Sequence, residues 1–246
     1  MEHPMPANLA SALITKLSVS NNLDAEDIRA IHGLRIRERH LDAGEVIVAD
    51  GDWPSDCCLI ADGFAFRSKT TADGERQVLS IHIPGEIPDL ESLHLKVMDH
   101  DLVTVTRCTL GFIAHDDLRE IIRRRPNLAS ALWRETLIDG AIFREWIVNV
   151  GRREATPRMA HLLIELHRRL KAIGQTRDGE FGLPITQTDL GDCLGLSVVH
   201  TNRVLQNLRK EGLVSVSRSE FHILKPKEMD ELAGFDSTYL HLSPST

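Results

Sequence analysis

The chain has 246 residues, of which 42 % are hydrophobic, and a formal net charge of −7. That length and content are enough for two domains with cores of their own. No apolar run approaches the roughly 20 residues that span a bilayer, and the N-terminus lacks a basic region followed by a hydrophobic block. We therefore expect a cytoplasmic protein with no membrane partner.

The four cysteines, at positions 57, 58, 108 and 193, show no spacing typical of a disulfide framework or a zinc site. Cys57 and Cys58 are adjacent, and neighbours in a strand point to opposite faces, so they are not expected to share a metal. We expect structural cysteines, no metal and no cofactor. The sequence leaves open whether a cysteine senses redox conditions.

Short β-type runs separated by glycine turns fill residues 40 to 115, within an expected first domain at 1–125 that also carries N-terminal helices. The turns recur at roughly the spacing of an all-β barrel or sandwich. Asp73-Gly74 is the strongest hairpin signal among them. The turns lie at Gly44, Gly51, Asp62-Gly63, Asp73-Gly74 and Pro84-Gly85.

A long helix is predicted over 126–150, and its apolar residues cover more surface than one contact needs. It either lies on the barrel alone or also pairs with its twin in a second chain. We favour pairing with the twin. Gly140 and Ala141 would let two backbones approach closely. The expected dimer interface comprises Trp133, Leu137, Gly140, Ala141, Phe143, Ile147 and Val148.

The next expected domain, 151–227, begins with a hinge near residues 151 to 156. Thr156 followed by Pro157 predicts a capped helix with proline in its first turn, ending at Gly174. A polar, glycine-rich loop follows over 174–184. Residues 228–246 are expected to form a C-terminal tail.

Residues 185–211 are the most informative segment, because they predict two short helices joined by a tight turn. Thr186 can cap the first helix, with Asp189 three residues on as a variant capping box. Gly195 can adopt the left-handed conformation that ends a helix, and Ser197 can cap the second. The competing interpretation is an ordinary helical hairpin with a polar outer face.

Two β-type runs around the turn SRSE follow these helices and predict a hairpin packed behind them. Helix, turn, helix and hairpin is the order of a winged helix. In the second helix the spacing of Val198, Thr201, Leu205 and Leu208, together with Val204, predicts the buried stripe.

The outward residues of the second helix are polar and include no carboxylate, which suits the major groove of DNA. The two basic residues at its far end suit phosphates and the helix dipole. The expected DNA contacts are Thr186, Gln187, Ser197, Val198, Val199, His200, Asn202, Arg203, Gln206, Arg209 and Lys210.

Charge is distributed unevenly along the chain. Residues 151–227 hold 13 Lys and Arg against 8 Asp and Glu, whereas the segments on both sides are acidic. A basic module on an acidic carrier can use phosphate contacts while the rest of the protein resists nonspecific binding. The alternative interpretation of this imbalance is chance fluctuation in a chain with this many charged residues.

The order of barrel, long helix and winged helix resembles the Crp/Fnr family of bacterial transcription regulators over about residues 25 to 225. The most specific parts are LxxGExIxxxG at 41–51, the LIADGFAF strand pair at 59–66, and the segment at 185–214. The resemblance implies an α+β chain. Its parts would be a cyclic-nucleotide-binding-type β-barrel (double-stranded β-helix), a long dimerisation helix and a C-terminal winged helix-turn-helix.

The resemblance further implies a non-enzymatic homodimer that binds double-stranded DNA at an inverted-repeat operator and contacts RNA polymerase. In relatives that bind cyclic AMP, a Gly-Glu pair binds the ribose and an arginine binds the phosphate. Here Asp89-Leu90 stands at the Gly-Glu position, and no arginine occurs between positions 96 and 107. A buried phosphate would lack its bidentate partner, so we do not expect cyclic AMP in the usual mode. The effector-binding residues stay unknown.

Members of the resembling family also sense through iron-sulfur centres or haem. The oxygen-sensing relatives hold an iron-sulfur centre on an N-terminal cysteine cluster, and this chain has no cysteine before Cys57. Haem stays open, because His82, His94 and His100 lie in the relevant region.

The reader segment departs from the family pattern at one place. Val198 and Val199 occupy the early positions where the family usually carries a carboxylate, whereas Arg203 matches the arginine that reads guanine. We therefore expect a different half-site, to which His200 and Asn202 contribute contacts and Val199 can offer a thymine methyl contact.

Two alternatives belong to other functional classes. A cupin-type metal-dependent barrel enzyme with an appended helical module would need a His-x-His pair, and His82 stands alone in SIHIPGE. A ligand-binding module that regulates another protein without touching DNA would not need the basic residues at 203, 209 and 210. The sequence names neither the effector, the operator nor the target genes, and does not separate activation from repression.

Overall fold

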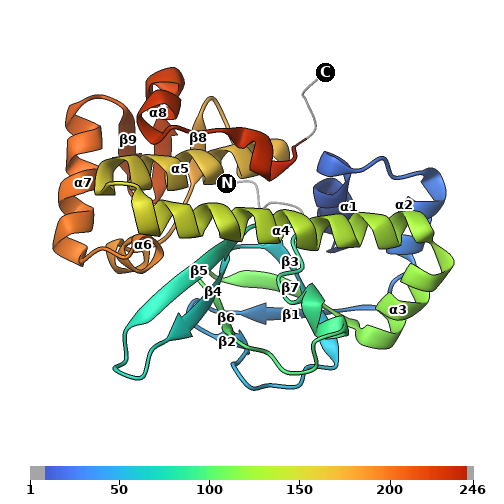
Figure 1. Ribbon diagram of the computed structural model, residues 1–246. Coiled ribbons are helices and arrows are strands. Elements are labelled where there is room, and N and C mark those ends of the chain that lie inside the picture. The colour runs from blue at the N-terminus through green and yellow to red at the C-terminus, as the bar shows by residue number, and fades with distance from the viewer. Residues whose placement is uncertain (1–8, 243–246) are drawn as a thin grey trace. The chain divides into compact units, whose positions relative to one another are not determined.

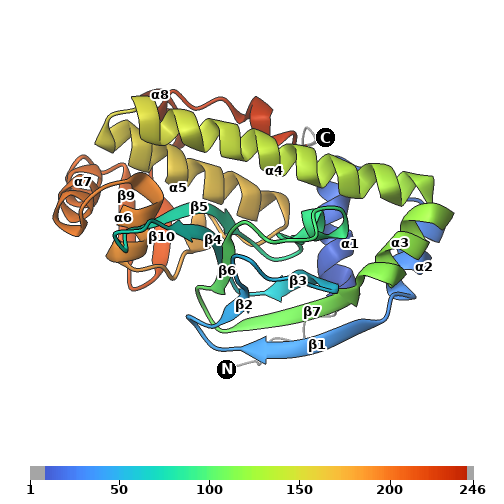
Figure 2. The same cartoon turned by 60° about the horizontal axis from the view of Figure 1, so that its bottom comes forward.

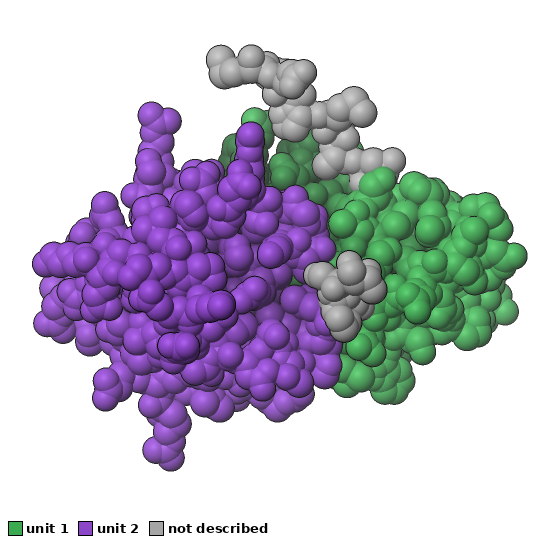
Figure 3. Space-filling model, turned by 90° about the horizontal axis from the view of Figure 1, so that it is seen from above, with its two compact units in different colours: residues 1–69, 80–139 green, residues 70–79, 140–246 purple. Residues whose placement is uncertain are grey.

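The structure is a computed structural model that describes residues 9–242 (Figure 1). Residues 1–8 and 243–246, the ends of the expected first domain and tail, lie outside the described part. The chain forms two compact units, coloured separately in Figure 3. Unit 1 comprises 1–69 and 80–139, and unit 2 comprises 70–79 and 140–246. The division thus falls inside the long helix instead of at its ends, and the tip of one hairpin belongs to unit 2.

Unit 1 is built on two β-sheets with the strand orders β1-β7-β3 and β2-β6-β4-β5. The β-region expected between residues 40 and 115 is therefore confirmed. The strands are β1 (Ile36–Leu41), β2 (Val46–Val48), β3 (Asp56–Asp62), β4 (Ala65–Thr70), β5 (Arg76–His82), β6 (Asp101–Thr104) and β7 (Cys108–Ala114).

Alternate side chains of β3 point into the two hydrophobic cores of this unit. Cys57 and Leu59 belong to a cluster that includes residues of the helices, whereas Cys58 and Ile60 belong to a second cluster between the two sheets. Adjacent strand residues point to opposite faces, which is why the neighbouring cysteines are separated. Figure 2 shows α1 (Leu9–Ser20), α2 (Ala25–His32) and α3 (His115–Arg124) gathered at one end of the sheets.

The long helix α4 (Pro126–Arg152) runs two residues beyond the predicted end and contributes residues to both units. Unit 2 is otherwise formed around α5 (Ala155–Ala172), whose apolar side chains are almost all buried. Its remaining elements are β8 (Glu180–Gly182), α6 (Gln187–Leu194), α7 (Val198–Lys210), β9 (Val214–Ser217), β10 (Glu220–Ile223), α8 (Pro226–Ala233) and the 3-10 turn η2 (Ser237–Leu240). No helix in the described part of the chain combines the length and apolar content that a bilayer crossing needs.

The predicted start of α5 is wrong by two residues. Its N-cap is Glu154, with extended backbone angles, and Thr156 already lies inside the helix. Proline is tolerated throughout a first turn, because those backbone N–H groups have no intrahelical partner. Pro157 therefore indicates the first turn without fixing which residue caps it.

Two segments expected to be irregular contain regular structure. The glycine-rich loop includes β8, which pairs antiparallel with β10. The sequence did not predict this strand, because three residues are too few to show the alternation of apolar and polar residues. The expected tail contains most of α8, which begins at Pro226 and ends at the left-handed Gly234. Proline at the first helical position and glycine after the last are the usual signals of a helix, so this helix was recognisable. Met229 and Leu240 are fully buried, and the segment packs as part of unit 2.

The helix-turn-helix depends on one close backbone contact. Leu196 N–H donates to the carbonyl of Gly191 at 3.0 Å, and Gly195 adopts the left-handed conformation at φ 61° as expected. A Cβ atom at Gly191 would lie 2.6 Å from the carbonyl oxygen of Leu196. A side chain at this position would therefore push α6 away from the turn.

Gly191→Ala is expected to destabilise the protein by about 1 to 2 kcal/mol in a urea unfolding titration. The steric cost of overpacking, about 1 to 3 kcal/mol, exceeds the gain of up to about 1 kcal/mol from replacing a helical glycine. Gly151→Ala on α4 is the matched control, because a Cβ there meets nothing within 4 Å. Equal stability of the two variants would show that the turn yields without cost.

Candidate functional site

The first helix of the pair begins with the capping box that the sequence predicts. The hydroxyl of Thr186 accepts from the backbone N–H of Asp189 at 3.1 Å, and the Asp189 carboxylate accepts from Thr186 N–H at 3.0 Å. Thr186 and Gln187 are exposed at the N-terminus of α6. The free N–H groups and the positive end of the helix dipole make such a terminus suitable for a phosphate.

The second helix, α7, presents a polar face to solvent. Its cap Ser197 accepts from His200 N–H at 3.3 Å, and Thr201, Val204, Leu205 and Leu208 are buried as predicted. Nearly all of the predicted DNA contacts are exposed. Those on or beside α7 are Ser197, Val198, Val199, Asn202, Arg203, Gln206, Arg209 and Lys210, while His200 is half-buried.

Val198 was expected both in the buried stripe and at the DNA. The prediction that it is buried is wrong, since its side chain is 44 % exposed. Helical side chains lean toward the N-terminus, so the side chain of the first residue extends past the helix end. Val199 beside it is 81 % exposed. Two apolar side chains therefore lie at the tip of α7, where an apolar contact with a thymine methyl is chemically suitable.

The cations of α7 are free to meet DNA. No ion pair within residues 9–242 engages Arg203, Arg209 or Lys210, although the surface carries many pairs elsewhere. Sequence reasoning missed one further cation, Arg218. It is exposed at the turn between β9 and β10 with φ 56°, at the tip of the predicted wing. The turn SRSE itself was the signal that pointed to it.

An apolar seam follows the exposed side of α4. Trp133, Leu137 and Ile147 are all more than half exposed, and with Gly140 they fall at spacings of four, three and seven. Such spacing is that of one face of a coiled coil. Phe143 and Val148 flank the seam, whereas Ala141, also expected at the interface, is 7 % exposed and packs within its own chain. The geometry of α4 thus suits pairing with a second copy.

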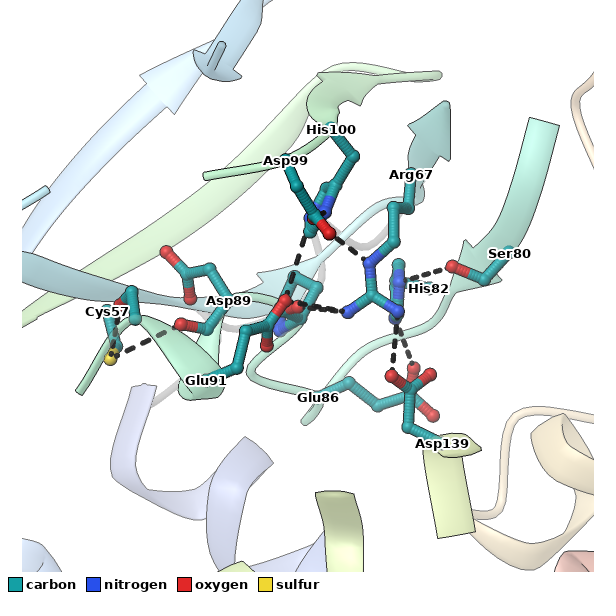
Figure 4. Close-up of polar contacts among 12 residues, drawn as sticks. Cys57, Arg67, Ser80, His82, Glu86, Asp89, Glu91, Asp99, His100 and Asp139 are labelled. Carbon is teal, nitrogen blue, oxygen red and sulfur yellow. Dashed lines mark hydrogen bonds and ion pairs between the residues drawn. The ribbon is translucent and has the colours of Figure 1, made fainter. Parts of the chain in front are cut away.

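A buried polar cluster occupies the interior of unit 1, centred on the guanidinium of Arg67 on β4 (Figure 4). Its Nη1 donates to Asp139 on α4 at 2.7 Å, and its Nε donates to Nε2 of His100 at 3.2 Å. Nη2 donates to the carbonyl of Pro88 and lies 3.5 Å from Glu91. Every nitrogen of the guanidinium therefore has a partner of this chain.

The histidines of the cluster are also engaged. His100 accepts from Arg67 through Nε2, so its Nδ1 carries the proton and donates to Asp99 at 2.7 Å. His82 lies between the Ser80 hydroxyl at 2.7 Å and Glu86 at 3.1 Å. Burial lowers the pKa of His82, so it is neutral at physiological pH.

Asp89, at the position of the ribose-binding pair in the resembling family, faces β3 instead of the cluster. Its carboxylate accepts from the backbone N–H of Cys58 at 2.8 and 3.1 Å. Burial raises the pKa of Asp89 to about 7, and the nearby Glu91 adds to the shift. The residue thus fills space and satisfies a strand N–H that would otherwise be unpaired.

Sequence reasoning looked for a phosphate-binding cation among residues 96 to 107 and missed Arg67, because its contacts lie 21 to 72 positions away along the chain. The cation is present, but Asp139 and Glu91 already neutralise it. Glu86, Glu91 and Asp139 together make this interior unfavourable for a further anion. Within residues 9–242, no group of three or more His, Cys, Asp or Glu side chains is arranged to hold a metal ion.

Comparison with known families gives two matches in the order of the structural parts. Residues 38–125 match a cyclic nucleotide-binding domain, and residues 157–232 match a Crp-like helix-turn-helix domain. The first match covers nearly all of the two sheets of unit 1, and the second begins inside α5 and ends inside α8.

Full-length relatives and a solved structure agree with these matches. The transcriptional activator protein anr of Pseudomonas aeruginosa is 27 % identical over 232 residues, covering 93 % of both chains. The nitrogen fixation regulation protein FixK of Rhizobium meliloti is 29 % identical over 190 residues, covering 77 % of this chain and 83 % of that protein. The structure of FixK2 from Bradyrhizobium japonicum shares the fold, with a TM-score of 0.74 and 22 % identity over 81 % of this chain and 98 % of that one.

The domain order, the capped helix pair with its wing, and the matches along the chain lead to one assignment. The chain belongs to the Crp/Fnr family and is a DNA-binding transcription regulator.

Proposed function

We propose that this regulator acts in the cytoplasm as a homodimer, paired through α4, on an inverted-repeat operator. The observation that carries the proposal is the outer face of α7. It offers the amide side chains of Asn202 and Gln206 together with Arg203, which forms no ion pair within residues 9–242, and α7 contains no carboxylate. Arginine can bridge O6 and N7 of guanine, and asparagine can do the same for adenine.

Dimerisation is supported by the seam on α4. Large apolar side chains exposed on one helix face of a soluble domain are costly unless a partner covers them. The spacing along the seam fits a parallel copy of the same helix. A Cβ at Gly140 would meet only the flexible end of the Arg144 side chain, at 3.5 Å, so this position permits a close approach. A two-fold dimer would present two copies of α7 to half-sites that are related by the same symmetry.

The partner of the bound regulator is proposed to be RNA polymerase, since the relative from Pseudomonas aeruginosa is named a transcriptional activator. The internal pairing of Arg67 supports a barrel that does not take cyclic AMP in the usual mode. An incoming phosphate would have to displace Asp139 and Glu91 from the buried guanidinium and would then lie beside these two carboxylates, which repel it.

Arg203→Ala is expected to relax discrimination at one base pair in each half-site, at a cost of about 1 to 3 kcal/mol. The measurement is selection of random duplexes by the full-length protein, followed by titration of the selected site at two salt concentrations. Lys210→Ala is the matched control, because loss of a phosphate contact weakens all sequences alike. Wild-type protein that prefers no sequence over random DNA at matched salt would contradict the proposed function.

Leu137→Asp is expected to convert the dimer to a monomer in sedimentation equilibrium, because it buries two like charges at the centre of the seam. Trp53→Asp introduces the same charge at a similarly exposed apolar residue of the barrel and should leave the oligomeric state unchanged. An unchanged dimer in the Leu137→Asp variant would remove α4 from the interface.

Arg67→Met is expected to lower the free energy of unfolding by about 1 to 3 kcal/mol. A broken buried pair costs more, but Asp139 and Glu91 are each about one third exposed and partly screened. Lys69→Met on the same strand, whose pair with Asp50 is exposed, should change the free energy of unfolding by less than about 0.5 kcal/mol.

Cyclic AMP is expected not to raise the melting temperature of the wild type, because Arg67 is already paired with Asp139 and Glu91. A clear rise would show that cyclic AMP binds the folded protein and would contradict this prediction.

A further inference from the structure

The tip of the β4–β5 hairpin, residues 70–79, is part of unit 2 and contacts α6. Arg76 Nε donates to the Asp192 carboxylate at 2.8 Å, and its Nη2 donates to Asp189 at 2.5 Å. Gln77 adds a third contact, from its side-chain amide to the backbone carbonyl of Asp192 at 2.7 Å. Two neighbouring side chains of the hairpin thus hold about one turn of α6, between Asp189 and Asp192.

The two carboxylates share a face because they are three residues apart on a helix. Arginine suits them, since its planar fork can donate to both at once, and lysine would act only as a point charge. All three side chains are at most about one third exposed, with values of 35 % for Arg76, 17 % for Asp189 and 24 % for Asp192. The contact is therefore shielded from solvent more than an ordinary surface ion pair.

The pKa of Asp189 agrees with its contact to Arg76. Burial by itself would raise the pKa of Asp189, but hydrogen bonds from Thr186 and from Arg76 outweigh it and hold the pKa below its usual value. Asp189 is thus ionised at neutral pH. Its negative charge lies in the first turn of α6, directly beside Thr186 and Gln187.

Those charges are unfavourable for DNA binding unless they are compensated. Thr186 and Gln187 are the expected phosphate contacts of α6, and a phosphate approaching them meets Asp189 and Asp192 within the following turn. Charges that are separated by less than the Debye length of about 8 Å at physiological salt still repel each other.

We propose that Arg76, although far from the helix-turn-helix in sequence, is a positioning residue of the DNA-binding module. Its single positive charge offsets one of the two negative charges of Asp189 and Asp192, and its hydrogen bonds fix the capped end of α6 for phosphate contact. The inference rests on the proposed function and adds to it a residue that lies outside the helix-turn-helix segment 185–211. Because the contribution is electrostatic and remote from base edges, it affects affinity for all sequences alike.

The test compares full-length wild type, Arg76→Gln, Asp192→Asn and the double variant on a selected operator and on a random duplex. Arg76→Gln is expected to weaken both complexes on the order of 3- to 10-fold at low salt and less at high salt. Adding Asp192→Asn to that variant is expected to restore part of the loss, because one uncompensated charge is removed. Arg107→Gln, which removes the same charge from an exposed arginine of the barrel, is the matched control.

The charge swap Arg76→Asp with Asp192→Arg keeps one of the two pairs in reversed order and carries the test if Arg76→Gln does not fold. It is expected to bind more tightly than Arg76→Asp alone. Affinity equal to or above wild type in Arg76→Gln, or an equal loss in Arg107→Gln, would overturn the inference. Wild-type protein without any preference for its selected operator would instead overturn the proposed function, so the two failures are distinguishable.

Discussion

The close approach of the α6 backbone to the turn at Leu196 is the constraint on which the recognition surface depends. α7 has thirteen residues, too few to hold a fixed direction by its own stability. Its direction comes from the hydrogen bond between Gly191 and Leu196 and from the left-handed residue at Gly195. A site that reads base edges tolerates little displacement, and a glycine without a side chain is what permits the two helices to meet so closely.

Two arginines of one hairpin use the same chemistry for different purposes. Arg67 is buried inside unit 1 and joins β4 to α4, while Arg76 lies in unit 2 and joins the hairpin tip to α6. The first satisfies a polar interior that would otherwise hold unpaired carboxylates. The second adjusts the charge of a surface. A barrel whose sheets match a nucleotide-binding domain has thus kept its frame while its interior polar residues pair with one another.

Local signals in the sequence were enough for the helix pair, its caps and the glycine turns. The capping box at Thr186 and the cap at Ser197 each depend on residues three positions apart, which a linear pattern shows directly. Helix α8 could also have been recognised, since Pro226 and Gly234 bound it. Its segment was nevertheless expected to be a tail.

The remaining features depend on contacts that no linear pattern contains. Arg67 meets Asp139 across 72 positions, and Arg76 meets Asp192 across 116. In the sequence each is an ordinary charged residue in a β-type run. Val198 shows the limit of periodicity itself, because its spacing is correct for the buried stripe but the helix begins there, and no earlier turn covers it.

The carboxylate of Asp189 accepts from the backbone N–H and hydroxyl of Thr186 and also from Arg76. Forming the first turn of α6 and docking the hairpin tip are therefore linked equilibria that share one acceptor. If docking of the hairpin raises the affinity of α6 for a phosphate by some factor, a bound phosphate must favour docking of the hairpin by the same factor. DNA binding would then reduce the fraying of both segments together, as one cooperative unit.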